Sequence, residues 1–356
     1  MIEKKVILVA DDSKASWKMA EKIQIYLGTV YHIPVGLVNL SAWNFSGGEF
    51  RPELRGDVKG SYCFHISDSD AHPATWWVAN ALAYSTLRTY GASCIEGVSP
   101  ILHWARQDKS EYGIEPKDFR SIASIQKYAR EVRPSLDGLI TLDPHSQEAI
   151  DAFQQPLPNN PLRPWQPGIR PVPVRVLNSY LIFAHYLVNN RPDLLPNKNQ
   201  RIVAASTDKG RSRIPFSLRD RFKFYGYECD MAFGDKERDV QGKLKDCRVA
   251  EGDVKDAIVF VGEDMIAGGG TAQYFTRDAK QKGARKVIML AGHGLFCDNA
   301  IDNKLTEIDE IFVTDSLMQT HKEVSTIPMG DFLSETIAAI ILGRDPQEAH
   351  RFFDQR

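Results

Sequence analysis

Short apolar runs alternate with segments of helical periodicity along almost the whole chain. The runs that predict strands are residues 6–10, 35–40, 62–66, 95–102, 138–142, 202–205, 257–261, 287–290 and 311–314. The segments that predict helices are residues 14–26, 75–90, 118–132, 176–188, 216–225, 272–281 and 332–342. Such alternation is typical of an α/β fold with mainly parallel sheets, because a helix has to carry the chain back between two parallel strands.

The length and one proline-rich segment predict two domains. A chain of 356 residues is long enough for two separate cores. Seven prolines fall within residues 156–173, and proline fixes φ and removes a backbone donor. We expect an extended connector or insertion there, between domains at 1–155 and 174–330, with the C-terminal helix at 331–356 as a candidate addition to the first. The alternative is an ordered surface arm that packs on a neighbour through Trp165.

Composition excludes several classes of protein. The formal net charge of −2 gives no field that would favour nucleic acid or an anionic membrane. No apolar run is long enough to span a bilayer, and the N-terminus shows no signal-peptide pattern. The five cysteines are scattered without a C-x-x-C pair, so we expect neither a zinc site nor a disulfide framework. A cytoplasmic protein fits these features.

The segment 259–271 reads V-F-V-G-E-D-M-I-A-G-G-G-T and is the strongest candidate for a site. Glu263 and Asp264 stand where the apolar strand 257–261 is expected to end, and a glycine turn and a helix follow. Backbone amides of such a turn can hold a phosphate. The acid pair can bind a sugar diol, directly or through Mg²⁺. The spacing fits neither a Walker loop nor a dinucleotide fingerprint, and an ordinary strand–turn–helix is the alternative.

Other polar segments also follow expected strands. Arg106 and Lys109 could bind phosphate oxygens, and His145, which lies close to a carboxylate, could hold Mg²⁺-nucleotide. Asp208 follows the strand 202–205 and suits a metal or a sugar hydroxyl. Taken singly, each charge at 106–109 is better explained by a solvated loop, a lone histidine is more often structural, and the residues around Asp208 also suit an ordinary turn.

Two further segments are expected to be a loop and a turn. Lys236 and Arg238 lie in a polar stretch, 234–245, and a mobile loop there could close over a polyphosphate. Phe45 and Glu49 flank a turn that could stack on and hydrogen-bond a purine. A solvated charge run and a plain turn are the alternatives.

The order of these segments resembles ribose-phosphate pyrophosphokinase, also called phosphoribosyl pyrophosphate synthetase, over about residues 6–342. The resemblance is carried by W-A-R-Q-D-K (104–109), I-T-L-D-P-H (140–145), the segment from 259 through A-G-H-G-L-F-C-D-N-A (291–300), and I-F-V-T-D (311–315). It implies two tandem phosphoribosyltransferase-type domains of type I. It also implies that the diphosphoryl group of Mg-ATP is transferred to the 1-hydroxyl of ribose 5-phosphate, and that AMP leaves.

The resemblance also assigns roles to residues. The ribose-phosphate positions are Glu263, Asp264, Ala267, Gly268, Gly269, Gly270 and Thr271. The ATP positions are Phe45, Glu49, Arg106, Gln107, Asp108, Lys109 and His145. The Mg²⁺-associated positions are His145 and Asp208, and the catalytic cations are Lys236, Arg238 and Arg106. In this family the adenine-binding turn reaches a neighbouring subunit, which implies a homo-oligomer built from dimers, commonly a hexamer.

The chain departs from the family pattern at several positions. Ala267 replaces the third aspartate of the ribose-phosphate loop and Gly268 replaces its first threonine. Gly47 replaces an aspartate of the adenine-binding turn, and the residues T-W-W at 75–77 replace a polar, acidic stretch. These departures indicate a divergent member and leave two alternatives: a non-catalytic regulatory paralogue of the synthetase, and a phosphoribosyltransferase that consumes the activated sugar.

Overall fold

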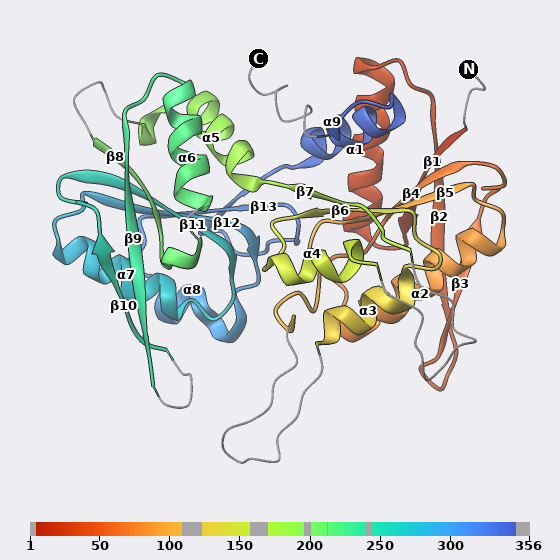
Figure 1. Ribbon diagram of the computed structural model, residues 1–356, viewed down its shortest axis with the longest axis horizontal. Coiled ribbons are helices and arrows are strands. Elements are labelled where there is room, and N and C mark those ends of the chain that lie inside the picture. The colour runs from red at the N-terminus through yellow and green to blue at the C-terminus, as the bar shows by residue number, and fades with distance from the viewer. Residues whose placement is uncertain are drawn as a thin grey trace. The chain divides into compact units, whose positions relative to one another are not determined.

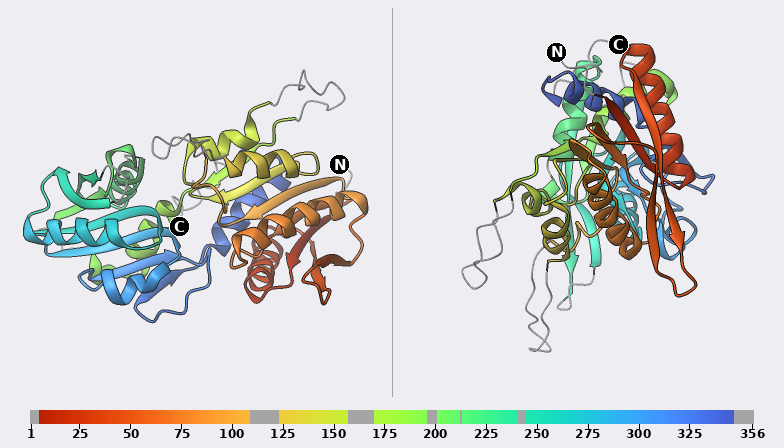
Figure 2. Two further views of the ribbon diagram at one scale, coloured as in Figure 1. Left: turned by 90° about the horizontal axis from the view of Figure 1, so that it is seen from below. Right: turned by 90° about the vertical axis from the view of Figure 1, so that its right-hand side faces the viewer.

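The computed structural model describes residues 5–108, 123–156, 170–195, 201–211, 213–239 and 244–346. The chain divides into two compact units, one formed by Met1–Leu177 with Gly330–Glu348 and the other by Asn178–Met329. Each unit has its own sheet (Figures 1 and 2). In the described part of the chain, no helix combines the length and the apolar character that a membrane span requires.

The sheet of the first unit has the strand order β3-β2-β1-β4-β5-β6-β7. Its strands are β1 (Val6–Asp11), β2 (Val35–Asn44), β3 (Phe50–Arg55), β4 (Tyr62–Ile66), β5 (Cys94–Ser99), β6 (Gly138–Leu142) and β7 (Val174–Leu177). All neighbours are parallel except β2 and β3, which form an antiparallel hairpin.

The sheet of the second unit repeats this plan, with the order β10-β9-β8-β11-β12-β13-β14. Its strands are β8 (Arg201–Ser206), β9 (Cys229–Arg238), β10 (Leu244–Glu251), β11 (Ala257–Ile266), β12 (Lys286–Gly294), β13 (Glu310–Thr314) and β14 (Val324–Ile327). Again only the hairpin, β9 with β10, is antiparallel. The expected fold of two α/β domains with mainly parallel sheets is confirmed.

Helices cover both faces of each sheet (Figure 1). In the first unit they are α1 (Lys14–Val30), α2 (Pro73–Thr89), α3 (Ser124–Val132), α4 (Gln147–Gln154) and α9 (Gly330–Ile341). In the second unit they are α5 (Ser179–Asn190), α6 (Arg213–Phe224), α7 (Gly270–Gln281) and the short α8 (Ala300–Lys304), with the 3₁₀ turns η1 (Pro192–Leu194), η2 (Lys209–Arg211) and η3 (Cys297–Asn299). The C-terminal helix α9 packs on α1, so the first unit is closed by a segment from the far end of the chain.

The expected helix at 176–188 starts later than its apolar pattern suggested. Residues 174–177 form β7, which pairs with β6 and completes the first sheet. Asn178 then caps α5, since its Oδ1 accepts the amide of Tyr180 at 3.0 Å. The two units therefore meet in sequence at 177–178 rather than at the expected 173–174.

The proline-rich segment begins and ends in the first unit, after α4 and before β7. The buried Arg133 guanidinium donates to the carbonyls of Gln155, at 2.8 Å, and Arg170, at 2.7 Å. Both described ends of the segment thus belong to the first unit, so it does not connect the two units and is better described as an insertion. Residues 157–169, with Trp165, lie outside the described residues.

We expect Arg133→Met to destabilise the first unit by about 2–4 kcal/mol, because the carbonyls that accept from its buried guanidinium would lose their charged donor. Arg133 also donates to the carbonyl of Ala152 at 3.1 Å. The free energy of unfolding should be measured in urea, with Arg130→Met, on the exposed face of the same helix, as the control. Equal stability of the two variants would show that the Arg133 contacts to Gln155 and Arg170 do not stabilise the first unit.

The hairpin β9–β10 was not expected, since its polar residues read as a loop. Lys236 lies inside β9 and pairs with Cys247 of β10. The expectation of a mobile loop is therefore wrong for residues 235–238. Their alternation places Lys236 towards the interior, with 13% of its side chain exposed.

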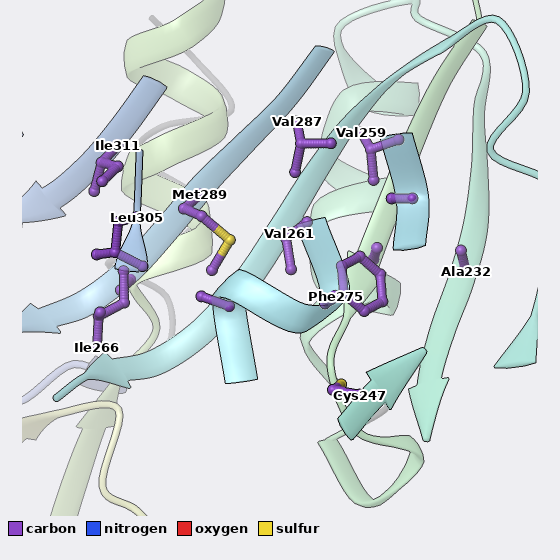
Figure 3. Packing of buried hydrophobic residues seen from close by; sticks show 14 of the residues in the cluster. Ala232, Cys247, Val259, Val261, Ile266, Phe275, Val287, Met289, Leu305 and Ile311 are labelled. Atoms are coloured by element: carbon purple, nitrogen blue, oxygen red, sulfur yellow. The ribbon is translucent and has the colours of Figure 1, made fainter. Parts of the chain in front are cut away.

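The core of the second unit packs α7 and α8 against the middle of its sheet. Phe275 of α7 lies beside Val261 of β11, and Leu305, which follows α8, lies beside Ile266 (Figure 3). These contacts fix both ends of the turn between β11 and α7, where the candidate site lies.

Candidate functional site

The acid pair lies inside β11, not beyond its end as expected. β11 continues to Ile266 because β12 runs beside it to Gly294 and pairs with its last residues. Glu263 and Asp264 are each only 6% exposed. Carboxylates this deeply buried need hydrogen-bonding partners. At functional sites some of these partners are supplied by the bound ligand, so a buried acid pair is a candidate binding site.

Each of these carboxylates has a described partner. Glu263 accepts a short hydrogen bond from the hydroxyl of Thr207, and Oδ1 of Asp264 accepts the amide of Met265 at 2.9 Å. Sequence reasoning missed Thr207, which follows β8; its place in S-T-D, next to the expected Asp208, is the signal that was available.

The turn after β11 presents backbone amides at the start of a helix. Gly269 is the N-cap of α7, has φ 71°, and offers no side chain to cap the helix. Among the described residues, the amides of 267–271 have no hydrogen-bond acceptor. A helix N-terminus with open amides attracts anions, so this turn has the geometry of a phosphate cradle.

Residues that follow β12 contact this turn and hold it in place. A Cβ on Gly269 would lie 2.9 Å from Cδ2 of Leu305, so glycine is needed there for space as well as for φ. The ammonium of Lys304 donates to the carbonyl of Gly268 at 2.9 Å. Lys304 was not among the expected site residues, because a contact over 36 positions leaves no local signal.

Lys236 and Asp208 lie together in the same unit. Nζ of Lys236 is 3.5 Å from Oδ2 of Asp208, which is 42% exposed. The structure thus gathers Lys236 with Asp208, and Thr207 with Glu263, at the ends of β8, β9 and β11. Arg238 ends β9, and its side chain lies outside the described residues.

The cysteines of the structure are all free thiols, and three of them are strongly shielded. Burial raises the pKa of Cys63, Cys229 and Cys247 to about 12. Cys297 is exposed. We therefore expect iodoacetamide at pH 8 to label Cys297 much faster than these three, because the thiolate is the nucleophile. Peptide mass spectrometry would measure the rates; fast labelling of Cys247 would contradict the burial of its side chain.

The segment that carries Arg106 sits on an aromatic cluster in the first unit. Trp104 has φ 68° and donates its Nε1 to the carbonyl of Pro73 at 3.1 Å. Its ring packs edge-on against Trp77, at 5.7 Å. The T-W-W stretch, which departs from the family pattern, therefore belongs to α2, and its Trp77 packs against this segment.

The polar residues of this segment face solvent. Arg106 and Gln107 are exposed, and Oε1 of Gln107 accepts the hydroxyl of Ser124 at 2.6 Å. Burial lowers the pKa of nearby His103, so that ring is neutral at pH 7 and Arg106 supplies the positive charge. Asp108 is half-buried, and Lys109 lies outside the described residues.

The remaining expected ATP positions also lie in the first unit. His145 is half-buried between β6 and α4. Phe45 and Glu49 close the turn between β2 and β3, where the amide of Phe45 donates to the Glu49 carbonyl at 2.8 Å. Phe45 is 46% exposed, and the Arg51 guanidinium carbon lies 5.9 Å from its ring centre.

Comparison with known proteins gives one consistent result. A sequence profile described as the N-terminal domain of ribose phosphate pyrophosphokinase matches residues 9–129. The ribose-phosphate pyrophosphokinase of Corynebacterium efficiens is 27% identical over 316 residues, which cover 86% of this chain and 86% of that protein. The protein of the same name from Thermotoga maritima is 24% identical over 332 residues, covering 92% of each chain.

A solved structure shares the fold. The crystal structure of phosphoribosylpyrophosphate synthetase from Mycobacterium smegmatis superposes with a TM-score of 0.72 at 21% identity, covering 96% of this chain and 99% of that one. The two sheets of equal strand order are therefore tandem phosphoribosyltransferase-type domains. Along nearly its whole length, in sequence and in fold, this chain is therefore similar to the ribose-phosphate pyrophosphokinases.

Proposed function

We propose that this chain is a ribose-phosphate diphosphokinase, which transfers the diphosphoryl group of Mg-ATP to ribose 5-phosphate and releases AMP. The observation that carries the proposal is the pairing of two buried carboxylates in β11 with a glycine turn whose amides lack partners in the described residues. Relatives that match this chain over most of their length are named ribose-phosphate pyrophosphokinase.

The second unit would hold the sugar phosphate. Glu263 and Asp264 accept hydrogen bonds from the ribose hydroxyls, and residues 267–271 receive the 5-phosphate. The 1-hydroxyl oxygen then bonds the β-phosphorus and loses its proton to solvent, while the bond from that phosphorus to the bridging oxygen breaks and AMP leaves with this oxygen. Phosphoryl transfer depends on positioning and charge neutralisation, so the main task of Lys236 is to stabilise charge on the transferred group.

The first unit would bind the nucleotide. The residues assigned to ATP are Phe45, Glu49, Arg106, Gln107, Asp108, Lys109 and His145. Phe45 offers an exposed ring for the base, and Arg106 an exposed guanidinium for phosphate oxygens. Arg238 is assigned beside Lys236 as a second cation.

Mg²⁺ would come with the nucleotide. Among the residues the structure describes, no three His, Cys, Asp or Glu side chains gather as a metal site. This fits Mg²⁺, which is usually bound by substrate phosphates and one or two carboxylates. Asp208, with its partly exposed carboxylate, and His145 are the residues we assign to it. When bound, the metal supplies charge neutralisation on the phosphates.

We also propose a cytoplasmic homo-oligomer, built from dimers and extending to a hexamer. The hairpin β2–β3 exposes Trp43 by 55% and Phe45 by 46%, which suits a contact with a second copy. The free cysteines fit a reducing compartment. With a net charge of −2, neither nucleic acid nor membrane is proposed as a partner.

One assay tests the proposal. The purified protein is mixed with ATP, Mg²⁺ and ribose 5-phosphate, and AMP is measured. We expect AMP only when the sugar phosphate is present. Absence of AMP with every divalent metal, while both ligands still bind, would instead support the regulatory paralogue, which Ala267 motivates by removing one carboxylate near the ribose.

The phosphoribosyltransferase alternative predicts a different reaction. Such an enzyme would consume phosphoribosyl pyrophosphate together with a purine or pyrimidine base and release diphosphate. The repeated domain and the match over 86% of the length of a ribose-phosphate pyrophosphokinase argue against it. Base-dependent release of diphosphate would overturn the proposed function.

A further inference from the structure

Lys304 stands directly beside the glycine turn. It is the last residue of α8, and its ammonium donates to the carbonyl of Gly268 at 2.9 Å. A Cβ built on Gly268 would lie 3.8 Å from the same nitrogen. The cation therefore borders the turn whose amides form the candidate phosphate cradle.

The backbone around Lys304 is fixed to the same turn. A Cβ on Gly269 would lie 2.9 Å from Leu305 and 3.3 Å from Ala300. The close approach of Leu305 and Ala300 to Gly269, together with the hydrogen bond from Lys304 to Gly268, thus joins α8 to the cradle. This arrangement brings an ammonium to the cradle without the need for a mobile loop.

The charge of Lys304 is not neutralised by a described carboxylate. Other lysines of this unit have such partners: Lys236 pairs with Asp208, and Lys280 with Asp309. Lys304 has instead a carbonyl, a weaker partner than an anion. Residue 267, next to Gly268, is an alanine and so offers no carboxylate to this ammonium.

We propose that Lys304 recognises the phosphate of the sugar phosphate and determines the preference for a phosphorylated pentose. This inference rests on the proposed function. An ammonium has three donors, of which the Gly268 carbonyl uses one, so Lys304 can hold the turn and a phosphate oxygen together. It would add a charge to a cradle whose own residues, 267–271, carry no charged side chain.

The test is Lys304→Met, with the Kd of ribose 5-phosphate measured by calorimetry and KM and kcat by AMP formation. We expect Kd and KM to rise about 10- to 100-fold, the loss expected for one charge-assisted hydrogen bond, with kcat within about threefold. The affinity for ATP should not change. Lys280→Met, at the C-terminal end of α7, is the matched control and should bind as the wild type does.

Two further variants distinguish the effect of the Lys304 charge on phosphate binding from the structural support that its side chain gives the turn. Lys304→Arg keeps the charge and should restore most of the affinity, whereas Lys304→Gln keeps only a neutral donor and should not. Wild-type affinity in Lys304→Met, or equal rescue by glutamine and arginine, would overturn the inference.

Inorganic phosphate distinguishes this inference from the proposed function. If the wild type formed no AMP, the proposed function would fail, while the role of Lys304 could still be judged by calorimetry with phosphate alone. A Kd for phosphate that rises in Lys304→Met, and returns towards the wild-type value in Lys304→Arg, supports the phosphate site. An unchanged Kd contradicts it.

Discussion

Lys236→Met is expected to lower the kcat of AMP formation by about 10³-fold, while the Kd of ribose 5-phosphate stays within about threefold. The lysine lies in β9, and its ammonium is 3.5 Å from Asp208. In the sheet, β8 lies between β9 and β11, the strand that carries the acid pair. The charge of Lys236 is expected to act on the transferred group, where charge develops, more than on the bound sugar. Single-turnover kinetics and calorimetry would measure the two quantities.

Lys245→Met is the control for this result. Lys245 is an exposed residue of the same hairpin. Its replacement removes one positive charge from the hairpin and leaves the candidate site residues unchanged. We expect wild-type kcat. Equal effects of the two variants, or parallel losses in kcat and affinity for Lys236→Met, would show that the lysine has no special role in the transition state.

Gly269→Val is expected to abolish detectable binding of ribose 5-phosphate, a loss of at least about 100-fold. Gly269 has φ 71°, which a β-branched residue adopts only at high cost, and a Cβ there would approach Leu305 to 2.9 Å. The turn would have to move, and its amides would no longer converge on one anion. Calorimetry gives the affinity, and thermal unfolding separates a moved turn from a lost fold.

Gly268→Ala provides the comparison one residue away. A Cβ on Gly268 would have a single neighbour within 4 Å, the flexible Lys304 ammonium at 3.8 Å. We expect a change in Kd of less than about threefold, because neither space nor φ demands glycine there. Similar losses at both positions would mean that the glycine turn does not select ligands by its shape.

The α/β plan could be predicted because many strands of both sheets contain a short run of mainly apolar residues. Residues 62–66 and 138–142, for instance, coincide with β4 and β6 as the structure has them. The hairpin β9–β10 could not be predicted in this way. It is the antiparallel edge of its sheet, and its charged residues, among them Asp235 and Glu237, obscure the alternation.

The strand β11 shows why the bounds of the site were misjudged. The rule that charged residues end a buried strand placed its last residue at 261, but Glu263 and Asp264 are buried inside it. Such exceptions concentrate at functional sites, where a ligand completes the hydrogen bonding. A rule for ordinary strands therefore fails at the position that matters most for function.

The candidate site was predictable in part. The glycine turn and the acid pair are contiguous in sequence, so one segment revealed them. Thr207 and Lys304 are brought to this segment by the order of the strands and by the packing of α8, over 56 and 36 positions. No local pattern reports the contact of Lys304, and the one local signal for Thr207 is its place beside Asp208.

The most direct test of the account is a crystal structure of the protein with ribose 5-phosphate. We expect the phosphate at the amides of residues 267–271, with Lys304 beside it, and the ribose hydroxyls at Glu263 and Asp264. A pentose bound at full occupancy away from residues 263–271 would contradict the central claim that the end of β11 and the start of α7 hold the sugar phosphate.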